Sequence, residues 1–270
     1  MYGFGIGISP SNRLFSSGGG SLDPDASAFI TTASITDGTQ QSAINQLVLD
    51  LKSYSIWSKM YAIYPMVGGN STSHSYNLKN ISQFQLSFVG GWTHSLTGAL
   101  PNGTNAYANT LLNASTLSLP YIGYYSRSNT NNGLAQIDMG CGPGVSSSYL
   151  WVSAWYNNGG YSNILGRNSS QSILLNGGAS TDSRGLFWVN KIGSTAKIGK
   201  NYSILNSATD SVNTPNINIY VGAMNNNSIA QSFTNRECSF SIIANGLTDI
   251  DTSNLYTSVQ AFQTTSSRNV

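Results

Sequence analysis

The chain has 270 residues but carries only 12 Lys/Arg and 10 Asp/Glu, so 8% of it is charged and its net charge is +2. Globular domains are typically about a quarter charged, and a charge this weak and scattered argues against a nucleic-acid partner. Hydrophobic residues make up 40% of the sequence, and no apolar run reaches the ~18 residues of a membrane helix, so we expect a folded domain with no membrane partner.

The first 22 residues form a separate piece of the chain. Four apolar residues alternate with glycines there, which is the periodicity of a strand with one bare face: Tyr2, Phe4, Ile6 and Ile8. A Gly/Ser-rich tether follows at 16–21. The sequence therefore predicts an extended docking arm at 1–22, ahead of one folded domain at 23–270. A disordered tail is the alternative.

Two helices are predicted to follow the arm. Asp23 can cap a short first helix that has Pro24 in its first turn. Thr36 or Asp37 can open the second helix, which we expect over 40–53. Its apolar residues fall at i, i+3, i+4 and i+7, the spacing of one buried helix face: Ile44, Leu47, Val48 and Leu51.

A last helix is predicted over 253–263, with Asp251 or Thr252 as its cap. Its inner face carries three apolar residues at helical spacing, namely Leu255, Val259 and Phe262. The terminal helices should pack together or against one edge of the rest. We therefore expect a shared core that buries Leu47, Leu51, Val259 and Phe262.

The long central part changes to the period-two pattern of strands. Short alternating runs occur at 83–88, 149–156, 185–190, 217–222 and 239–244. Asn-Gly pairs, which favour tight turns, begin at 102, 132, 158, 176 and 245. Many short strands with few helices between them indicate a mainly β fold, a β-sandwich.

Several segments resemble, in order, a family of bacteriophage virion structural proteins found in crAss-like and related phages of Bacteroidota. They are 25–37, 40–45, 56–65, 88–94, 246–249, 255–256 and 259–265. The resemblance implies a concanavalin-like (laminin-G-type) jelly-roll sandwich with N-terminal helices and one C-terminal helix packed at its edge. It also implies a place on the virion, after synthesis in the bacterial host cytoplasm, as a head or tail fibre, a capsid decoration or a tail protein.

We expect no catalytic residues, no metal site and no cofactor. Glu237 is the only glutamate and has no acidic residue within four positions, so the paired carboxylates of a retaining glycosidase are missing. An ion pair with the adjacent Arg236 is the favoured role for Glu237. The run 249–253 begins like a calcium loop, but helix capping explains the same residues.

The two histidines and two cysteines are predicted to be structural. His74 and His94 are too few for a typical zinc set, so we expect buried hydrogen-bonding roles for both. Cys141 and Cys238 lack metal spacing, and a chain of this size does not need a disulfide. Free, buried thiols are therefore expected.

The aromatic run at 149–161 is the best candidate for a ligand surface, through Trp151, Trp155, Tyr156 and Tyr161. Aromatic rings stack on sugars and proteins, and the neighbouring Asn amides both donate and accept hydrogen bonds. Trp151 and Trp155 should share one strand face, however, so a role in the core is the alternative. Tyr161 follows an Asn-Asn-Gly-Gly turn and is expected to be exposed.

Two functions fit this sequence. The first is a non-enzymatic virion structural protein that displays a lectin-like sandwich on the particle. In that case the arm binds other virion proteins, and a homotrimer is expected by analogy with fibres and decorations. The alternative is a receptor-binding lectin module that recognises glycan on the bacterial host surface. An enzyme is the third and least favoured class, because acidic side chains are so few.

Overall fold

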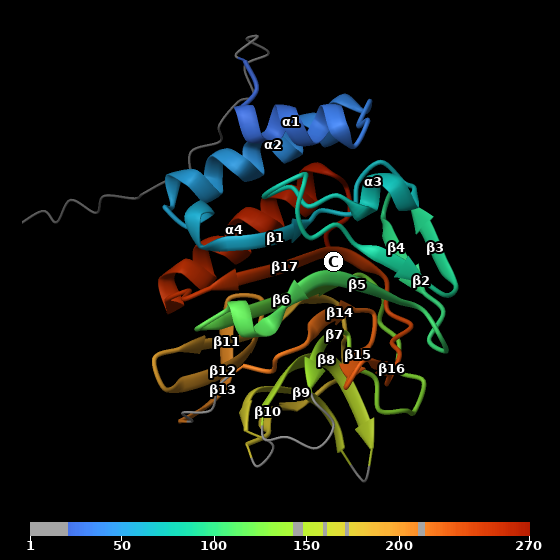
Figure 1. Ribbon diagram of the computed structural model, residues 1–270, viewed down its shortest axis with the longest axis vertical. Helices are drawn as coiled ribbons and strands as arrows, with labels where there is room; N and C mark the ends of the chain where they lie inside the picture. The colour runs from blue at the N-terminus through green and yellow to red at the C-terminus, as the bar shows by residue number, and fades with distance from the viewer. Residues whose placement is uncertain (1–20, 143–147, 159–160, 171–172, 210–213) are drawn as a thin grey trace, which may run out of the picture.

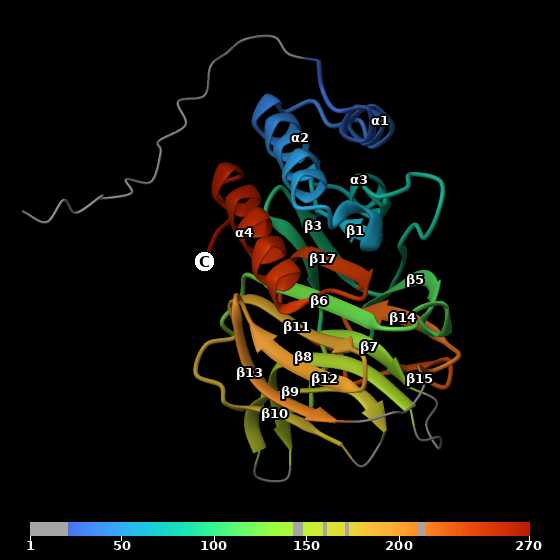
Figure 2. The ribbon, with the colours of Figure 1, turned by 90° about the vertical axis from the view of Figure 1, so that its left-hand side faces the viewer.

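The computed structural model describes residues 21–142, 148–158, 161–170, 173–209 and 214–270. Most of the arm, including Tyr2, Phe4, Ile6 and Ile8, therefore lies outside the described residues. The described chain forms two sheets and a layer of helices, stacked in the order helices, sheet A and sheet B (Figures 1 and 2).

Sheet A is antiparallel and has eight strands. In spatial order they are β13 (Ser203–Thr209), β12 (Thr195–Lys200), β11 (Gly185–Ile192), β6 (Pro120–Ser126), β17 (Cys238–Asn245), β4 (Gly98–Pro101) and β3 (Trp92–Ser95), with β1 (Met60–Tyr64) also paired to β17. Both β11 and β17 are buried along nearly their whole length, because the centre of sheet A is covered on both faces.

Sheet B has nine strands and lies on the other side of sheet A from the helices. Its order is β10 (Leu175–Ala179), β9 (Tyr161–Ser170), β8 (Ser148–Asn158), β7 (Met139–Gly142), β14 (Asn218–Val221), β5 (Tyr107–Asn113) and β2 (Ser87–Val89), and β15 (Met224–Asn226) and β16 (Ile229–Gln231) lie off this path. Its described pairings are antiparallel except for the parallel pair β15 and β7.

The main core lies between the two sheets. Tyr124 of β6 and Val189 of β11 meet Leu150 and Val152 of β8 there, and all four are fully buried. Alternate residues of each strand enter this layer, which is the packing of an antiparallel sandwich. The predicted fold class, a mainly β jelly-roll-type sandwich with terminal helices, is confirmed.

A second core joins the helices to the outer face of sheet A. The helices are α1 (Pro24–Thr32), α2 (Gly38–Ser53), α3 (Ser71–Ser75) and α4 (Asp249–Thr265), with short 3-10 turns at Trp57–Lys59 and Ala114–Thr116. Leu47 of α2 and Phe262 of α4 pack with Trp188 and Phe240 of sheet A. The sequence predicts these helices at an edge of the sandwich. In the structure they cover the outer face of sheet A. The burial of Leu47, Leu51, Val259 and Phe262 is confirmed.

The helix caps agree with the sequence at α1 and α2 but not at α4. Asp23 caps α1 and Asp37 caps α2. Helix α4 begins earlier than predicted, because Thr248 is its cap. The Thr248 hydroxyl accepts a hydrogen bond from the Asp251 amide, and the Asp251 carboxylate accepts one from the Thr248 amide. The run 249–253, which begins like a calcium loop, is therefore the first turn of a helix with a capping box.

Four of the five strand runs are confirmed, and the run at 83–88 is not. Only Ser87–Val89 forms a strand there, since Phe84 has a left-handed φ of 57° that interrupts the extended backbone. Of the Asn-Gly pairs, the one at 158 joins two neighbouring paired strands, β8 and β9. No helix among the described residues is both long and apolar enough to cross a membrane.

Candidate functional site

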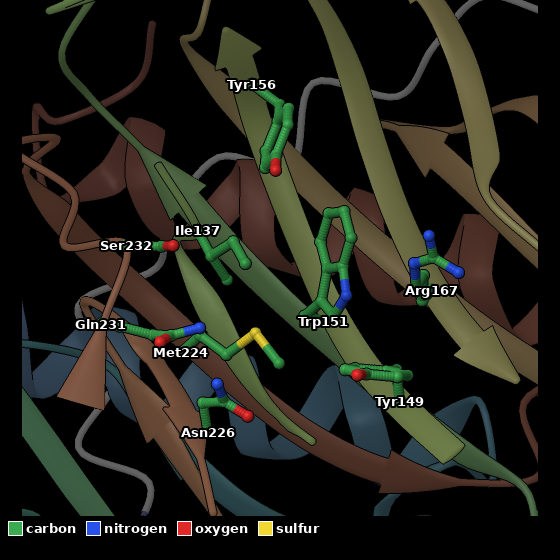
Figure 3. Close-up of a pocket in the computed structure, with 9 residues that line it drawn as sticks. All are labelled: Ile137, Tyr149, Trp151, Tyr156, Arg167, Met224, Asn226, Gln231 and Ser232. Carbon is green, nitrogen blue, oxygen red and sulfur yellow. The ribbon is translucent and has the colours of Figure 1, made fainter. Parts of the chain in front are cut away.

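A shallow pocket of about 210 Å³ opens on the outer face of sheet B. Figure 3 shows three aromatic side chains along β8, with Arg167 of β9 on one side and polar residues of the β15–β16 hairpin on the other. The residues that line the pocket are Ile137, Tyr149, Trp151, Tyr156, Arg167, Met224, Asn226, Gln231 and Ser232. None of these nine is acidic.

Strand alternation places the aromatic residues on this outer face. Leu150 and Val152 point into the core between the sheets, so Tyr149 and Trp151 point outward. Trp151 is only 5% exposed and packs with Ile137, Leu165 and Met224 in a small third cluster. Tyr149 and Tyr156 are half-buried, so their rings form the accessible part of the aromatic surface.

A β-bulge in β8 brings Tyr156 to the same face as Trp151. The pairing with β9 shifts by one residue between Ser153 and Tyr156, and an extra residue reverses the alternation of faces beyond it. Trp151 and Tyr156 stack with ring centroids 5.7 Å apart and planes at 24°. The expectation that Trp151 shares a face with Trp155 is therefore wrong. Trp155 does not line the pocket, and its indole N–H donates to the Ser162 hydroxyl at 2.7 Å.

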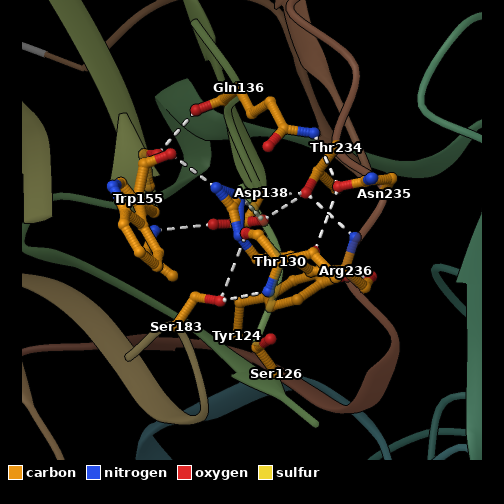
Figure 4. Close-up of polar contacts among 12 residues, drawn as sticks. Tyr124, Ser126, Thr130, Gln136, Asp138, Trp155, Ser183, Thr234, Asn235 and Arg236 are labelled. Atoms are coloured by element: carbon orange, nitrogen blue, oxygen red, sulfur yellow. Dashed lines mark hydrogen bonds and ion pairs between the residues drawn. The ribbon is translucent and has the colours of Figure 1, made fainter. Parts of the chain in front are cut away.

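Buried polar side chains satisfy the backbone atoms of this bulge (Figure 4). The Ala154 amide donates to the Asp138 carboxylate at 2.7 Å, and the Ala154 carbonyl accepts from the Ser180 hydroxyl at 2.9 Å. Arg236 donates to the Trp155 carbonyl and forms an ion pair with Asp138, at 3.2 Å. Both members of this ion pair are fully buried. The pair therefore holds β8 in the form that stacks Tyr156 on Trp151.

The predicted ion pair between Glu237 and Arg236 is wrong. Successive residues of an extended chain point to opposite sides, and Arg236 points into the interior toward Asp138. Glu237 forms an ion pair with Arg127 at 2.9 Å and accepts a hydrogen bond from the Thr97 hydroxyl at 2.6 Å. Its carboxylate is thus engaged in structural contacts away from the pocket.

Arg167 is a pocket residue that sequence reasoning missed. It lies opposite Trp151 in the β8–β9 pairing, and its guanidinium carbon is 5.7 Å from the centroid of the Tyr149 ring. Burial lowers the pKa of Arg167, and the nearby Tyr149 and Tyr156 act against that decrease. If β8 had no bulge, the hairpin register that starts at Asn158 and Tyr161 would place Asn168, and not Arg167, opposite Trp151. The sequence around Arg167 therefore gives no sign that it lies in the pocket.

The wall across from Arg167 offers neutral hydrogen-bonding groups from Asn226, Gln231 and Ser232 (Figure 3). The Asn226 Oδ1 atom is shielded from solvent and has no hydrogen-bond partner among the described residues. Such an acceptor is costly to bury unless a ligand or water satisfies it. The side chain of Tyr161, the remaining predicted ligand residue, lies outside the described part of the structure.

The histidines and cysteines occupy structural positions. His74 is buried and His94 is half-buried, with their Nδ1 atoms 2.9 Å apart in a hydrogen bond. Cys141 and Cys238 are free and buried, as predicted. Within the described residues, no group of three or more His, Cys, Asp or Glu side chains is placed to hold a metal ion.

No protein-family model and no curated protein matches the sequence. Solved structures do resemble the fold. The Trypanosoma rangeli sialidase in complex with sialic acid aligns with a TM-score of 0.53 at 9% identity, over 74% of this chain and 33% of the sialidase. A mutant of that sialidase with trans-sialidase activity gives a TM-score of 0.53 at 8% identity, over 82% of this chain and 39% of the other.

A smaller protein aligns along nearly its whole length. Domain 4 of AbnA, an extracellular arabinanase from Geobacillus stearothermophilus in complex with arabinotriose, has a TM-score of 0.43 at 13% identity, over 73% of this chain and 98% of that domain. The chain spans about a third of the sialidase chains but most of this domain. The likeness to the two sialidase structures concerns the fold alone, and it agrees with the β-sandwich described above.

Proposed function

We propose that the chain is a non-enzymatic glycan-binding module whose site is the aromatic pocket on the outer face of sheet B. The observation that carries this proposal is the pairing of two kinds of surface in one pocket. Tyr149, Trp151 and Tyr156 supply aromatic rings, and Asn226, Gln231 and Ser232 supply amide and hydroxyl groups. The lectin-like fold is consistent with this role, although a fold alone does not define a function.

The two surfaces correspond to the two sides of a sugar ring. The C–H face of a pyranose is apolar and packs on an aromatic ring, and its hydroxyl groups need hydrogen-bond partners. The buried Asn226 Oδ1 can accept from such a hydroxyl. At about 210 Å³, the pocket is smaller than the ~300 Å³ at which sites for drug-sized ligands begin. We therefore expect recognition of one or two sugar units with modest affinity.

Binding is proposed to occur without hydrolysis. The pocket lining contains no carboxylate, and glycoside hydrolysis by the usual mechanism needs two. Glu237 is held by Arg127 and Thr97 away from the pocket. Incubation with host polysaccharide should therefore release no reducing sugar. Sustained release that is lost in Glu237→Gln would contradict this part of the proposal.

The test is glycan-array binding followed by calorimetric titration with the best ligand. Tyr156→Ala should reduce the affinity at least about tenfold, a change of about 1.4 kcal/mol, because it removes one of the two accessible stacking rings. Tyr202→Ala is the matched control, since Tyr202 is 69% exposed and contacts Tyr256 of α4 on the helix side of the molecule. Equal affinities of the two variants for every bound glycan would reject the pocket as the site.

A place on the virion is a second proposal, and it is compatible with the first. It rests on the sequence resemblance and on the position of α1, which lies at the far end of the molecule from β8 and β9 (Figures 1 and 2). Attachment through the N-terminal arm would leave the pocket directed away from the particle. Mass spectrometry of purified virions, with and without the gene, tests this proposal, and absence of the chain from the particles would reject it.

A further inference from the structure

We infer that the glycan bound in this pocket carries a carboxylate, and that the Arg167 guanidinium recognises it. This inference rests on the proposed function and adds the chemical class of the ligand. Sugars of this class include uronic acids and sialic acids, in which a carboxylate is attached to a ring that also has a C–H face. A site for them needs a cation beside an aromatic surface.

The β8–β9 pairing provides this arrangement. Arg167 sits opposite Trp151, so its side chain leaves sheet B on the same face as the stacked rings of Trp151 and Tyr156. The Tyr149 ring, 5.7 Å from the guanidinium carbon, contacts the cation and limits its orientation. A ring placed on Tyr156 or Tyr149 would therefore have the guanidinium at its edge (Figure 3).

The charges of the pocket favour an anion. Arg167 is the only charged residue among the nine that line it. The guanidinium is partly removed from water, and the charges of ions interact more strongly where water is partly excluded. Its planar group of N–H donors matches a carboxylate through two parallel hydrogen bonds, which a lysine cannot reproduce.

The opposite wall suits the remainder of an acidic sugar. Asn226, Gln231 and Ser232 are neutral, so they can bind ring hydroxyls without repelling a carboxylate. The site then has two separate contributions: stacking and neutral hydrogen bonds, which any suitable sugar would use, and the Arg167 contact, which only an acidic sugar would use. These contributions can be measured separately.

The experiment compares acidic glycans with their neutral counterparts by titration calorimetry on the full chain. The two pairs are trigalacturonic acid with its methyl ester, and 3′-sialyllactose with lactose. Arg167→Met retains the length of the side chain without the charge, and Arg167→Lys retains the charge without the planar group. Melting temperatures of both variants establish that the fold is intact.

We expect the unmodified chain to bind at least one acidic glycan about tenfold or more tightly than its neutral counterpart. Arg167→Met should remove that preference and change the affinity for the neutral glycan less than about twofold, and Arg167→Lys should restore only part of it. Raising the salt concentration should weaken acidic binding alone, since charge contacts are screened.

Two results would overturn the inference in different ways. If acidic and neutral glycans bind equally, and Arg167→Met changes neither affinity while Tyr156→Ala weakens both, the carboxylate assignment is wrong and glycan binding stands. If no acidic or neutral glycan binds, and Tyr156→Ala has nothing to weaken, both the inference and the proposed function are wrong.

Discussion

Asp138 and Arg236 show how a fully buried ion pair can serve a surface site. The pair lies behind β8, and its polar atoms replace the sheet hydrogen bonds that the bulge at Ala154 and Trp155 cannot form. A hydrophobic replacement could not donate to or accept from these backbone atoms. The stacking of Tyr156 on Trp151 therefore depends on residues that do not touch the pocket.

Removing one charge of this pair should be costly. We predict that Asp138→Asn lowers the free energy of unfolding by about 3–5 kcal/mol, because Arg236 is left buried without its counter-charge. Asp182→Asn is the matched control: its partner Arg184 is 46% exposed, so the loss should stay under about 1 kcal/mol. Urea denaturation measures both, and equal losses would show that the buried pair is unimportant.

His74 gives the fold a specific pH dependence. Burial and the positive charges of His94 and Arg268 lower the pKa of His74 to about 3. The unfolded chain has the ordinary histidine pKa of about 6.5 and binds a proton below that pH, whereas the folded chain does not. The contribution of His74 to the free energy of unfolding is therefore complete above pH 6.5 and is lost as the pH falls toward 3.

We predict that, through His74, the free energy of unfolding decreases by about 1.4 kcal/mol for each pH unit that the pH is lowered across this window. His74→Gln should remove this pH dependence. The unfolding free energy of the unmodified chain minus that of the variant should therefore rise from pH 4 to about pH 6.5 and then level off. Chemical denaturation at several pH values provides the measurement. Parallel curves for the chain and the variant would show that His74 takes up its proton as easily in the fold.

At the scale of single elements, α2 and α4 are the clearest case of agreement between sequence and structure. Their amphipathic spacing is a local property, and it identifies Leu47 and Phe262 as core residues without knowledge of the sheets. The aromatic strand at 149–156 is equally visible in the sequence. Its bulge is not, because the residues that stabilise the bulge, Asp138 and Arg236, come from distant parts of the chain.

The same reasoning explains which residues of the candidate site the sequence identifies and which it does not. Trp151 and Tyr156 belong to one aromatic run and are apparent in the sequence. Arg167 reaches the pocket through the register between β8 and β9, and Asn226 reaches it through the pairing of β15 with β7. Neither pairing can be predicted from a local sequence pattern. The predicted strand at 83–88 failed for a similar reason: Tyr64 donates to the Phe84 carbonyl and so draws that segment out of the sheet.

The packing between α2, α4 and sheet A should contribute strongly to stability. We predict that Leu47→Ala lowers the unfolding free energy by about 2–5 kcal/mol and that Phe262→Ala lowers it by about 3–5 kcal/mol, through lost burial and the cavity left behind. Leu49→Ala on the same helix is the control, because Leu49 is 42% exposed and should change it by less than about 0.5 kcal/mol. A loss for Leu47→Ala no greater than that of Leu49→Ala would contradict this packing.

At the scale of the whole molecule, the three layers give the two faces of the sandwich different roles. The centre of sheet A lies between the helices and sheet B (Figure 2), which is why β11 and β17 are buried along nearly their full length. The outer face of sheet B carries the pocket instead. The sequence predicts the sandwich and the terminal helices, but it places the helices at an edge, and their position over the outer face of sheet A follows only from the complete strand order.

The arm should be separable from this three-layered body. The two main cores run from Ala26 to Phe262, so we predict that deleting residues 2–9 leaves the melting temperature nearly unchanged. If the chain is a virion protein anchored by the arm, the same deletion should prevent its incorporation into particles. Calorimetry tests the first expectation and particle composition the second. Normal incorporation of the shortened chain would show that the arm is not the anchor.

The distance between α1 and the pocket has a consequence for binding strength. If the chain is attached through its N-terminal arm, as proposed, several copies gathered by their N-terminal ends would present their pockets in one direction. Each second contact then becomes intramolecular, with an effective concentration set by the tether rather than by the bulk solution. Avidity of this kind can exceed single-site affinity by roughly 10²–10⁴-fold, so a shallow pocket with modest affinity can still hold an assembly firmly on a glycan-coated surface.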